Sequence, residues 1–155
     1  MTPEQKLKEM GVDLQNLPPA AAFGAYVPAK KVGTLIYVSG QLPMRDGQLI
    51  AAGQVPSRCS VEEAEEAAKW CAINALIAVH RLEGTLANIK GVVRVGAFVA
   101  SDAYFTRQPT VANGASELLI EIFGDAGRHV RAAVGTNVLP LDASVEIEFI
   151  FETNS

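Results

Sequence analysis

The segment from Ser144 to Phe151 constrains the fold most, because its apolar and polar residues alternate. A period of two is typical of a β-strand that buries one face and leaves the other outside the core. The apolar face would carry Val145, Ile147, Phe149 and Phe151, and the opposite face Glu146, Glu148, Ile150 and Glu152. The chain therefore needs a sheet, and other elements must cover the apolar face of that sheet.

Two helical segments are predicted to provide this cover. Ser60 and Glu63 have the spacing of a capping box and open a helix that ends near Gly84. Its apolar stripe consists of Ala64, Ala68, Cys71, Ala75, Val79 and Leu82. A second helix is predicted from about Pro109 to Phe123, followed by Gly124. Two helices beside about six strands indicate an α+β fold, with a single sheet and both helices on one face.

The remaining strands are predicted from short runs rich in β-branched and aromatic residues between turn signals. They are Ala25–Val27 and Leu35–Val38 as a hairpin, then Gln48–Ala52, Val92–Ala100 and His129–Val134. The other face of the sheet must then be solvated or covered by another copy of the chain.

The amino-terminal segment is predicted to be a short helix and a linker. A second capping box at Thr2–Gln5, with Gly11 as a stop, predicts a helix over residues 3–10. Residues 12–22 contain Pro18 and Pro19 and favour an extended linker. We therefore divide the chain into residues 1–22 and a main domain of residues 23–155.

Charge and composition exclude several classes of partner. The chain has 155 residues, with 13 Lys+Arg against 17 Asp+Glu, and hence a net charge of −4. Beyond Lys30 and Lys31 it has no basic cluster, which argues against a nucleic-acid or anionic-membrane partner. It has no secretory signal pattern and no apolar run of about 18 residues. Without such an apolar run, we expect a soluble protein. Two cysteines are too few for a disulfide framework, which together with the missing signal pattern favours the cytoplasm.

Known cofactor and metal motifs are absent from the sequence. The only histidines are His80 and His129, and Cys59 and Cys71 do not have the spacing of a metal site. There is no GxGxxG, Walker or GxSxG sequence, and nothing places Ser39 beside a histidine. We expect neither a metal nor a cofactor.

Arg131 is the residue that most needs an explanation, because it interrupts an otherwise apolar strand. A charge in such a strand must find a partner or an opening to solvent. An ion pair with a glutamate of the next strand is favoured from the residues alone, and binding of an anionic ligand is the alternative. Glu146 and Glu148 share one strand face, which is more often a solvated surface than a site.

The carboxy-terminal stretch combines Arg131 at the opening of one predicted strand, Leu139-Pro140 in the following loop and Glu146-x-Glu148 in the closing strand. This combination resembles the signature of the Rid (YjgF/YER057c/UK114) family. Upstream, Tyr26 and the sequence Ser39-Gly40-Gln41-Leu42-Pro43 resemble the family's amino-terminal hairpin. The resemblance covers about residues 21–152. It implies a chorismate-mutase-like single mixed sheet, usually a homotrimer with ligand clefts between subunits.

The resemblance also implies an activity and a set of site residues. Members of the family's best understood branch hydrolyse reactive enamines and imines, such as 2-aminoacrylate and 2-iminobutanoate, to 2-keto acids and ammonia. By motif, Arg131 would bind the substrate carboxylate and Glu146 would position the attacking water. The cleft would be lined by Tyr26, Ser39, Gly40 and Asn113. This chain departs from the best-known branch at Ala133, where that branch has a cysteine, and at His129-Val130, which replace a proline-containing approach.

Two other functions remain open at this point. The first is a binding module, in which the same cleft holds a small carboxylate, such as a 2-keto acid, without turnover. Some relatives carry the names endoribonuclease or translation inhibitor. We rank a ribonuclease last, since a charge of −4 offers RNA little to bind.

Overall fold

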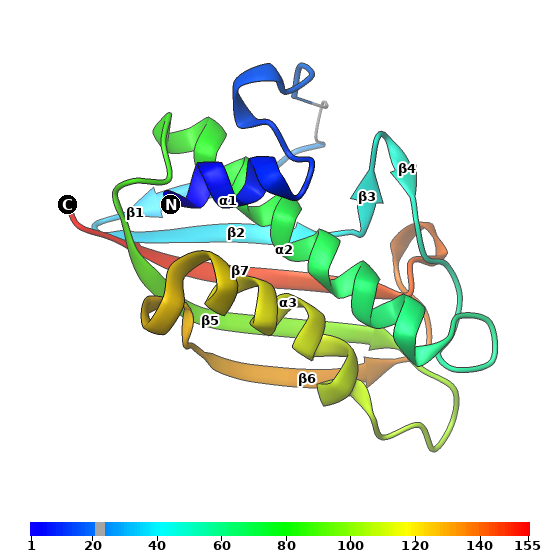
Figure 1. Cartoon of the computed structure of the whole chain (residues 1–155). Coiled ribbons are helices and arrows are strands. Elements are labelled where there is room, and N and C mark those ends of the chain that lie inside the picture. Colours follow the sequence, from blue (N-terminus) through cyan, green and yellow to red (C-terminus); the bar gives the residue numbers. More distant parts are fainter. Residues whose placement is uncertain (21–23) are drawn as a thin grey trace.

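The structure is a computed structural model that describes residues 1–20 and 24–155. It is an α+β fold of two layers, in which two long helices lie across one face of a five-stranded sheet (Figure 1). The strand order is β1-β2-β7-β5-β6. The strands are β1 (Ala29–Val32), β2 (Leu35–Gln41), β5 (Ile89–Ala100), β6 (Val130–Thr136) and β7 (Val145–Thr153).

The sheet is mixed, because β5 and β6 are parallel whereas the other neighbours are antiparallel. The alternation predicted for the last strand is confirmed. Its helix-facing side chains are almost fully buried, and Glu146, Glu148, Ile150 and Glu152 lie on the other face. β6 lies at one edge of the sheet, and its register pairs Arg131 with Val95 of β5.

The helices α2 (Val61–Glu83) and α3 (Gln108–Phe123) confirm the predicted helical segments. The capping box of Ser60 and Glu63 is formed, and Gly84 ends α2 with a φ of 78°, which glycine adopts without strain. The two helices pack closely at Gly114, where a Cβ atom would overlap the backbone carbonyl of Glu65. This close packing lets both helices cover the same sheet face.

The short helix α1 (Pro3–Glu9) packs against the rest of the chain. Leu7 is fully buried, and the Lys6 ammonium donates to the carbonyls of Glu121 and Ile122 at the end of α3. The division of the chain at residue 22 stays a prediction. Residues 21 and 22 of the predicted linker, and residue 23, where the main domain was placed to begin, lie outside the described residues.

Three details of the predicted elements are wrong. Ala25 and Tyr26 lie in a bend and Val27 belongs to no strand. The first strand begins at Ala29, because Pro28 has no N–H to donate to a ladder. Gln48–Ala52 does not join the main sheet. Instead, β3 (Met44–Arg45) and β4 (Gln48–Leu49) form a separate two-stranded sheet. The linker contains a 3-10 turn, η1 (Leu14–Asn16), which the Asp13 carboxylate caps.

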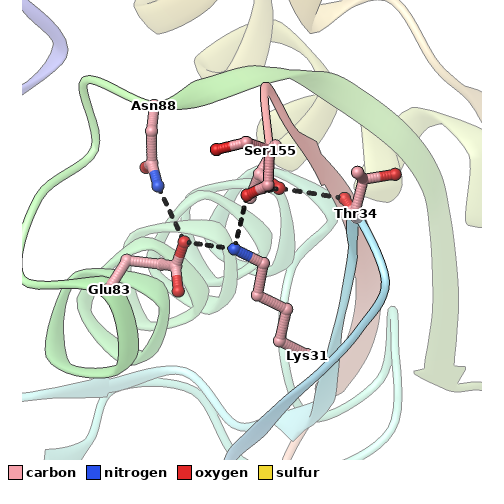
Figure 2. A network of polar contacts seen from close by, with 6 residues as sticks. Lys31, Thr34, Glu83, Asn88 and Ser155 are labelled. Carbon is pink, nitrogen blue, oxygen red and sulfur yellow. Dashed lines mark hydrogen bonds and ion pairs between the residues drawn. The ribbon is translucent and has the colours of Figure 1, made fainter.

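A polar network joins the end of the chain to the end of α2 (Figure 2). The Lys31 ammonium lies 3.1 Å from Glu83 Oε1 and 2.8 Å from the carbonyl oxygen of Ser155. Asn88 Nδ2 donates to the same Glu83 oxygen at 2.7 Å. The Asn88 hydrogen bond, followed by the Lys31 contact, lowers the pKa of Glu83. The ionised carboxylate thereby holds β1, α2 and the chain end together.

The sheet face away from the helices carries exposed apolar side chains. They are Tyr37 of β2, Val93 and Phe98 of β5, and Val130 and Val134 of β6. No helix in residues 1–20 or 24–155 has the length and apolar character needed to cross a membrane.

Candidate functional site

Arg131 is exposed near the start of the edge strand β6, on the sheet face that also carries the helices. Its Nη1 donates to Asn113 Oδ1 at 2.8 Å and to Ser116 Oγ at 3.2 Å, both in α3. No carboxylate of the described residues lies within ion-pair distance of its guanidinium. The ion pair favoured from the residues alone is therefore not formed, whereas Arg131 and Asn113 are in direct contact.

The side chain of His129 is hydrogen-bonded to Ser116, and so joins the group that contacts Arg131. Its Nδ1 lies 2.6 Å from the carbonyl oxygen of Gly127, which only accepts, so Nδ1 carries a hydrogen. Its Nε2 lies 2.8 Å from Ser116 Oγ. Burial lowers the pKa of His129; the hydrogen bond to Gly127 opposes this shift, and the nearby charge of Arg131 adds to it. The ring is thus neutral at pH 7, and the Ser116 hydroxyl donates to Nε2.

Sequence reasoning missed Ser116 and His129, although two signals were present. Ser116 follows Asn113 by three residues, which places both on one helix face. His129 precedes Arg131 by two residues on the same segment. An open pocket of about 220 Å³ lies at this point, lined by Ser116, His129 and Arg131 among others.

Glu146 lies in β7 on the opposite sheet face, where it is half-buried against Gly40 of β2. A Cβ atom at Gly40 would overlap the Glu146 carboxylate. The strand pairing is irregular there, between Val38 and Gln41. Burial raises the pKa of Glu146, and the charge of Glu148 raises it further. Such a carboxylate binds a proton more readily than an exposed one.

Tyr26, Ser39 and Gly40 line a pocket of about 290 Å³ together with side chains of α2, including Asn74 and Arg81. The Ser39 hydroxyl donates to the carbonyl of Val27 at 2.7 Å, which leaves its oxygen as an acceptor only. The structure therefore brings Tyr26, Ser39 and Gly40 to one pocket, with Glu146 against Gly40.

One chain does not bring Arg131 and Glu146 together. Glu146 pairs with Phe98 of β5, and Phe98 pairs with Val134 of β6, three residues beyond Arg131. Two strand spacings and three residue rises separate the two Cα atoms by about 14 Å. The two side chains also lie on opposite faces of the sheet. The predicted site residues therefore fall into two groups. Arg131 and Asn113 form one half-site. The second half-site is centred on Gly40, which lines a pocket with Tyr26 and Ser39 and lies against the Glu146 carboxylate, although Glu146 does not line that pocket.

Comparison with known proteins decides the family. The family model described as "YjgF/chorismate_mutase-like, putative endoribonuclease" matches residues 4–153. This chain belongs to the YjgF/chorismate-mutase-like family. The match confirms the resemblance and the fold predicted from the sequence, and it includes most of α1.

Individual relatives of this YjgF-family chain agree with the assignment. Protein TCP17 of Trypanosoma cruzi is 40% identical over 152 residues, which is 96% of this chain and 92% of that protein. The crystal structure of Atu1372 from Agrobacterium tumefaciens has a TM-score of 0.88 and 45% identity, covering 98% of this chain and 92% of that one. The structure of a "putative endoribonuclease" from Shewanella oneidensis has a TM-score of 0.90 and 34% identity, covering 98% and 99%.

Metal-ligating side chains are dispersed in this YjgF-family chain. Within residues 1–20 and 24–155, no three His, Cys, Asp or Glu side chains are grouped so as to hold one ion. Both Cys59 and Cys71 are buried as free thiols, and burial raises the pKa of each.

Proposed function

We propose that this chain hydrolyses reactive 2-imino and 2-enamino acids, such as 2-iminobutanoate and 2-aminoacrylate, to 2-keto acids and ammonia. The observation that carries the proposal is the guanidinium of Arg131, which is exposed, held by Asn113 and Ser116, and close to no carboxylate of the described residues. A guanidinium matches a planar carboxylate with two parallel hydrogen bonds. Arg131 would therefore fix the substrate and orient its C=N carbon.

Glu146 is the proposed base. A water held by its carboxylate adds its oxygen to C2 of the protonated imine, and Glu146 accepts the proton that this water loses. Glu146 then returns this proton to the amino nitrogen of the carbinolamine. As the C–N bond breaks, the C2 hydroxyl gives its proton to Glu146 and forms the C=O bond, so the 2-keto acid and ammonia are released, and Glu146 passes the proton to the ammonia. A 2-enamino acid enters the same sequence after it takes up a proton from solvent at C3, which gives the protonated imine. The raised pKa of Glu146 suits a group that must both take up and release a proton.

The two half-sites require a second copy of the chain. A substrate of three or four carbons is too short to contact Arg131 and Glu146 when their Cα atoms are about 14 Å apart on opposite sheet faces. We infer a homotrimer in which Arg131 and Asn113 of one subunit face the half-site of Glu146 in the next. The exposed apolar side chains of the sheet, such as Phe98 and Val134, support contact between copies.

A carboxylate-binding module without turnover is the second candidate. It is supported by the Arg131 half-site, whose bonds to Asn113 and Ser116 form within one chain and do not involve Glu146. The name endoribonuclease, which the family model and several relatives carry, is a third hypothesis. The net charge of −4 gives that hypothesis less support.

A coupled assay separates these functions. A pyridoxal-phosphate dehydratase generates 2-iminobutanoate or 2-aminoacrylate in the cuvette, and the rate of 2-keto acid formation is followed with and without the protein. The proposed deaminase accelerates this step. Binding of 2-keto acids without acceleration on any 2-imino acid supports the binding module, and cleavage of RNA by the purified protein supports the third hypothesis.

A further inference from the structure

Within residues 1–20 and 24–155, the guanidinium of Arg131 is held at one nitrogen, Nη1. Nη1 carries two hydrogens, and these bond Asn113 Oδ1 at 2.8 Å and Ser116 Oγ at 3.2 Å. Among the described residues, neither Nε nor Nη2 donates a hydrogen bond. The edge formed by Nε–H and one Nη2–H is therefore available to a ligand, whereas the Nη1 hydrogens are not.

Ser116 is in turn fixed by His129. The neutral ring donates from Nδ1 to Gly127 O and accepts the Ser116 hydroxyl hydrogen at Nε2. This leaves only lone pairs of Ser116 Oγ directed at Arg131. Gly127 is itself immobilised, because it packs so closely on α3 that a Cβ atom there would overlap the carbonyl of Leu119. A directed chain of hydrogen bonds thus runs from Arg131 to the backbone.

We propose that Ser116 and His129 are positioning residues for Arg131, and that they make the carboxylate ligand bind side-on, through Nε–H and Nη2–H. This inference rests on the proposed function, since it concerns the same arginine. An end-on grip through both terminal nitrogens would require an Nη1 hydrogen, and so would break the bond to Asn113 or to Ser116. Side-on binding keeps both bonds. It also fixes the direction in which the C=N carbon of a bound substrate points relative to the guanidinium plane.

Substitutions at Ser116 and His129 test the positioning role, with the affinity for 2-oxobutanoate measured by calorimetry. Ser116→Ala removes one acceptor of Nη1, and we expect about tenfold weaker binding. His129→Asn keeps a donor near the Nδ1 position but loses the acceptor at Nε2, and should weaken binding similarly. His129→Gln places an amide oxygen near the Nε2 position, and should restore affinity to within about threefold of wild type. His80→Asn, in α2, is the matched histidine control.

Two further measurements separate positioning from a loss of structure. In an Arg131→Ala background, Ser116→Ala should cause no further loss of affinity, because its effect passes through the arginine. In the wild-type protein labelled with ¹⁵N-arginine, 2-oxobutanoate should shift the Nε–H resonance of Arg131. An unshifted Nε–H resonance in the saturated protein would overturn side-on binding.

The outcomes also distinguish this inference from the proposed function. If wild type binds 2-oxobutanoate and both Ser116→Ala and His129→Asn bind it equally well, the positioning role is refuted and the proposed function is untouched. If wild type binds no 2-keto or 2-imino acid, both are refuted. Equal losses from Ser116→Ala with and without Arg131 would also overturn the inference, since they would show a general structural effect.

Discussion

Replacing Arg131 by alanine separates a structural arginine from a ligand-binding one. The exposed side chain loses two hydrogen bonds to neutral partners, Asn113 Oδ1 and Ser116 Oγ. At about 0.5–1 kcal/mol each, the low end of the usual range because Arg131 is exposed, the free energy of unfolding should fall by about 1–2 kcal/mol. Breaking a buried ion pair would instead cost about 3–5 kcal/mol. For a chain of this length the expected loss lowers Tm by about 3–6 °C.

The same substitution should have a much larger effect on activity. A bidentate grip on a carboxylate consists of two charge-assisted hydrogen bonds, so kcat/KM for 2-iminobutanoate should fall by about 100-fold or more. Arg131→Lys should be nearly as inactive, because the ammonium cannot make the planar grip. Arg107→Ala, an exposed arginine at the start of α3, is the matched control and should keep full activity.

Urea unfolding, the mass of the assembly and the coupled deaminase assay together decide this prediction. A folded, assembled Arg131→Ala protein with undiminished activity would refute the role of Arg131. A loss of 3–5 kcal/mol with normal activity in the remaining folded protein would restore the structural interpretation.

Three further substitutions test other parts of the account. Glu146→Gln should leave 2-oxobutanoate binding intact and slow turnover by about 100-fold or more. Because the folded state raises the pKa of Glu146, ionisation of this carboxyl opposes folding. Glu146→Gln should therefore match or exceed the stability of wild type at pH 7. The variant should lose that advantage as the pH falls through the raised pKa. Wild-type kcat/KM should fall over the same range, as the base becomes protonated. Gly40→Ala should displace the Glu146 carboxylate, and retention of full activity in that variant would contradict the site. Glu83→Gln should lower the free energy of unfolding by about 1 kcal/mol at pH 7. The difference from wild type should disappear as the pH falls through the lowered pKa of Glu83. A difference that stays constant down to pH 2 in urea unfolding would count against the network with Lys31 and Asn88.

The sequence predicted the elements whose period was unambiguous. β7 has a strict period of two, and α2 has a capping box, a wide apolar stripe and a terminal glycine, so local physics decides both. Ala25–Val27 has strand composition, but Pro28 ends any ladder there. The short strands β3 and β4 flank Gly47, and no local signal shows that they pair only with each other.

The family motif named the candidate site residues, but it did not predict how these residues lie relative to one another. Arg131 and Asn113 lie 18 residues apart in sequence, and the packing of α3 on β6 brings them into contact. The separation of Arg131 from Glu146 depends on the register of β5 against both neighbours, which no local pattern encodes. The link from His129 to Ser116 depends on the turn at Gly127, and so became visible only in the structure.

The most direct test of a site shared between subunits is complementation between Arg131→Ala and Glu146→Gln. Each variant alone should be inactive. In a mixed cyclic trimer, one interface pairs an intact Arg131 with an intact Glu146 of the next subunit, so random equal mixing by co-expression should restore about one quarter of wild-type activity. Purification through tags on both variants leaves only mixed trimers, in which one of the three interfaces is intact, so the predicted result in the coupled assay is about one third of wild-type activity. Mixed trimers that stay as inactive as the separate variants would contradict the account.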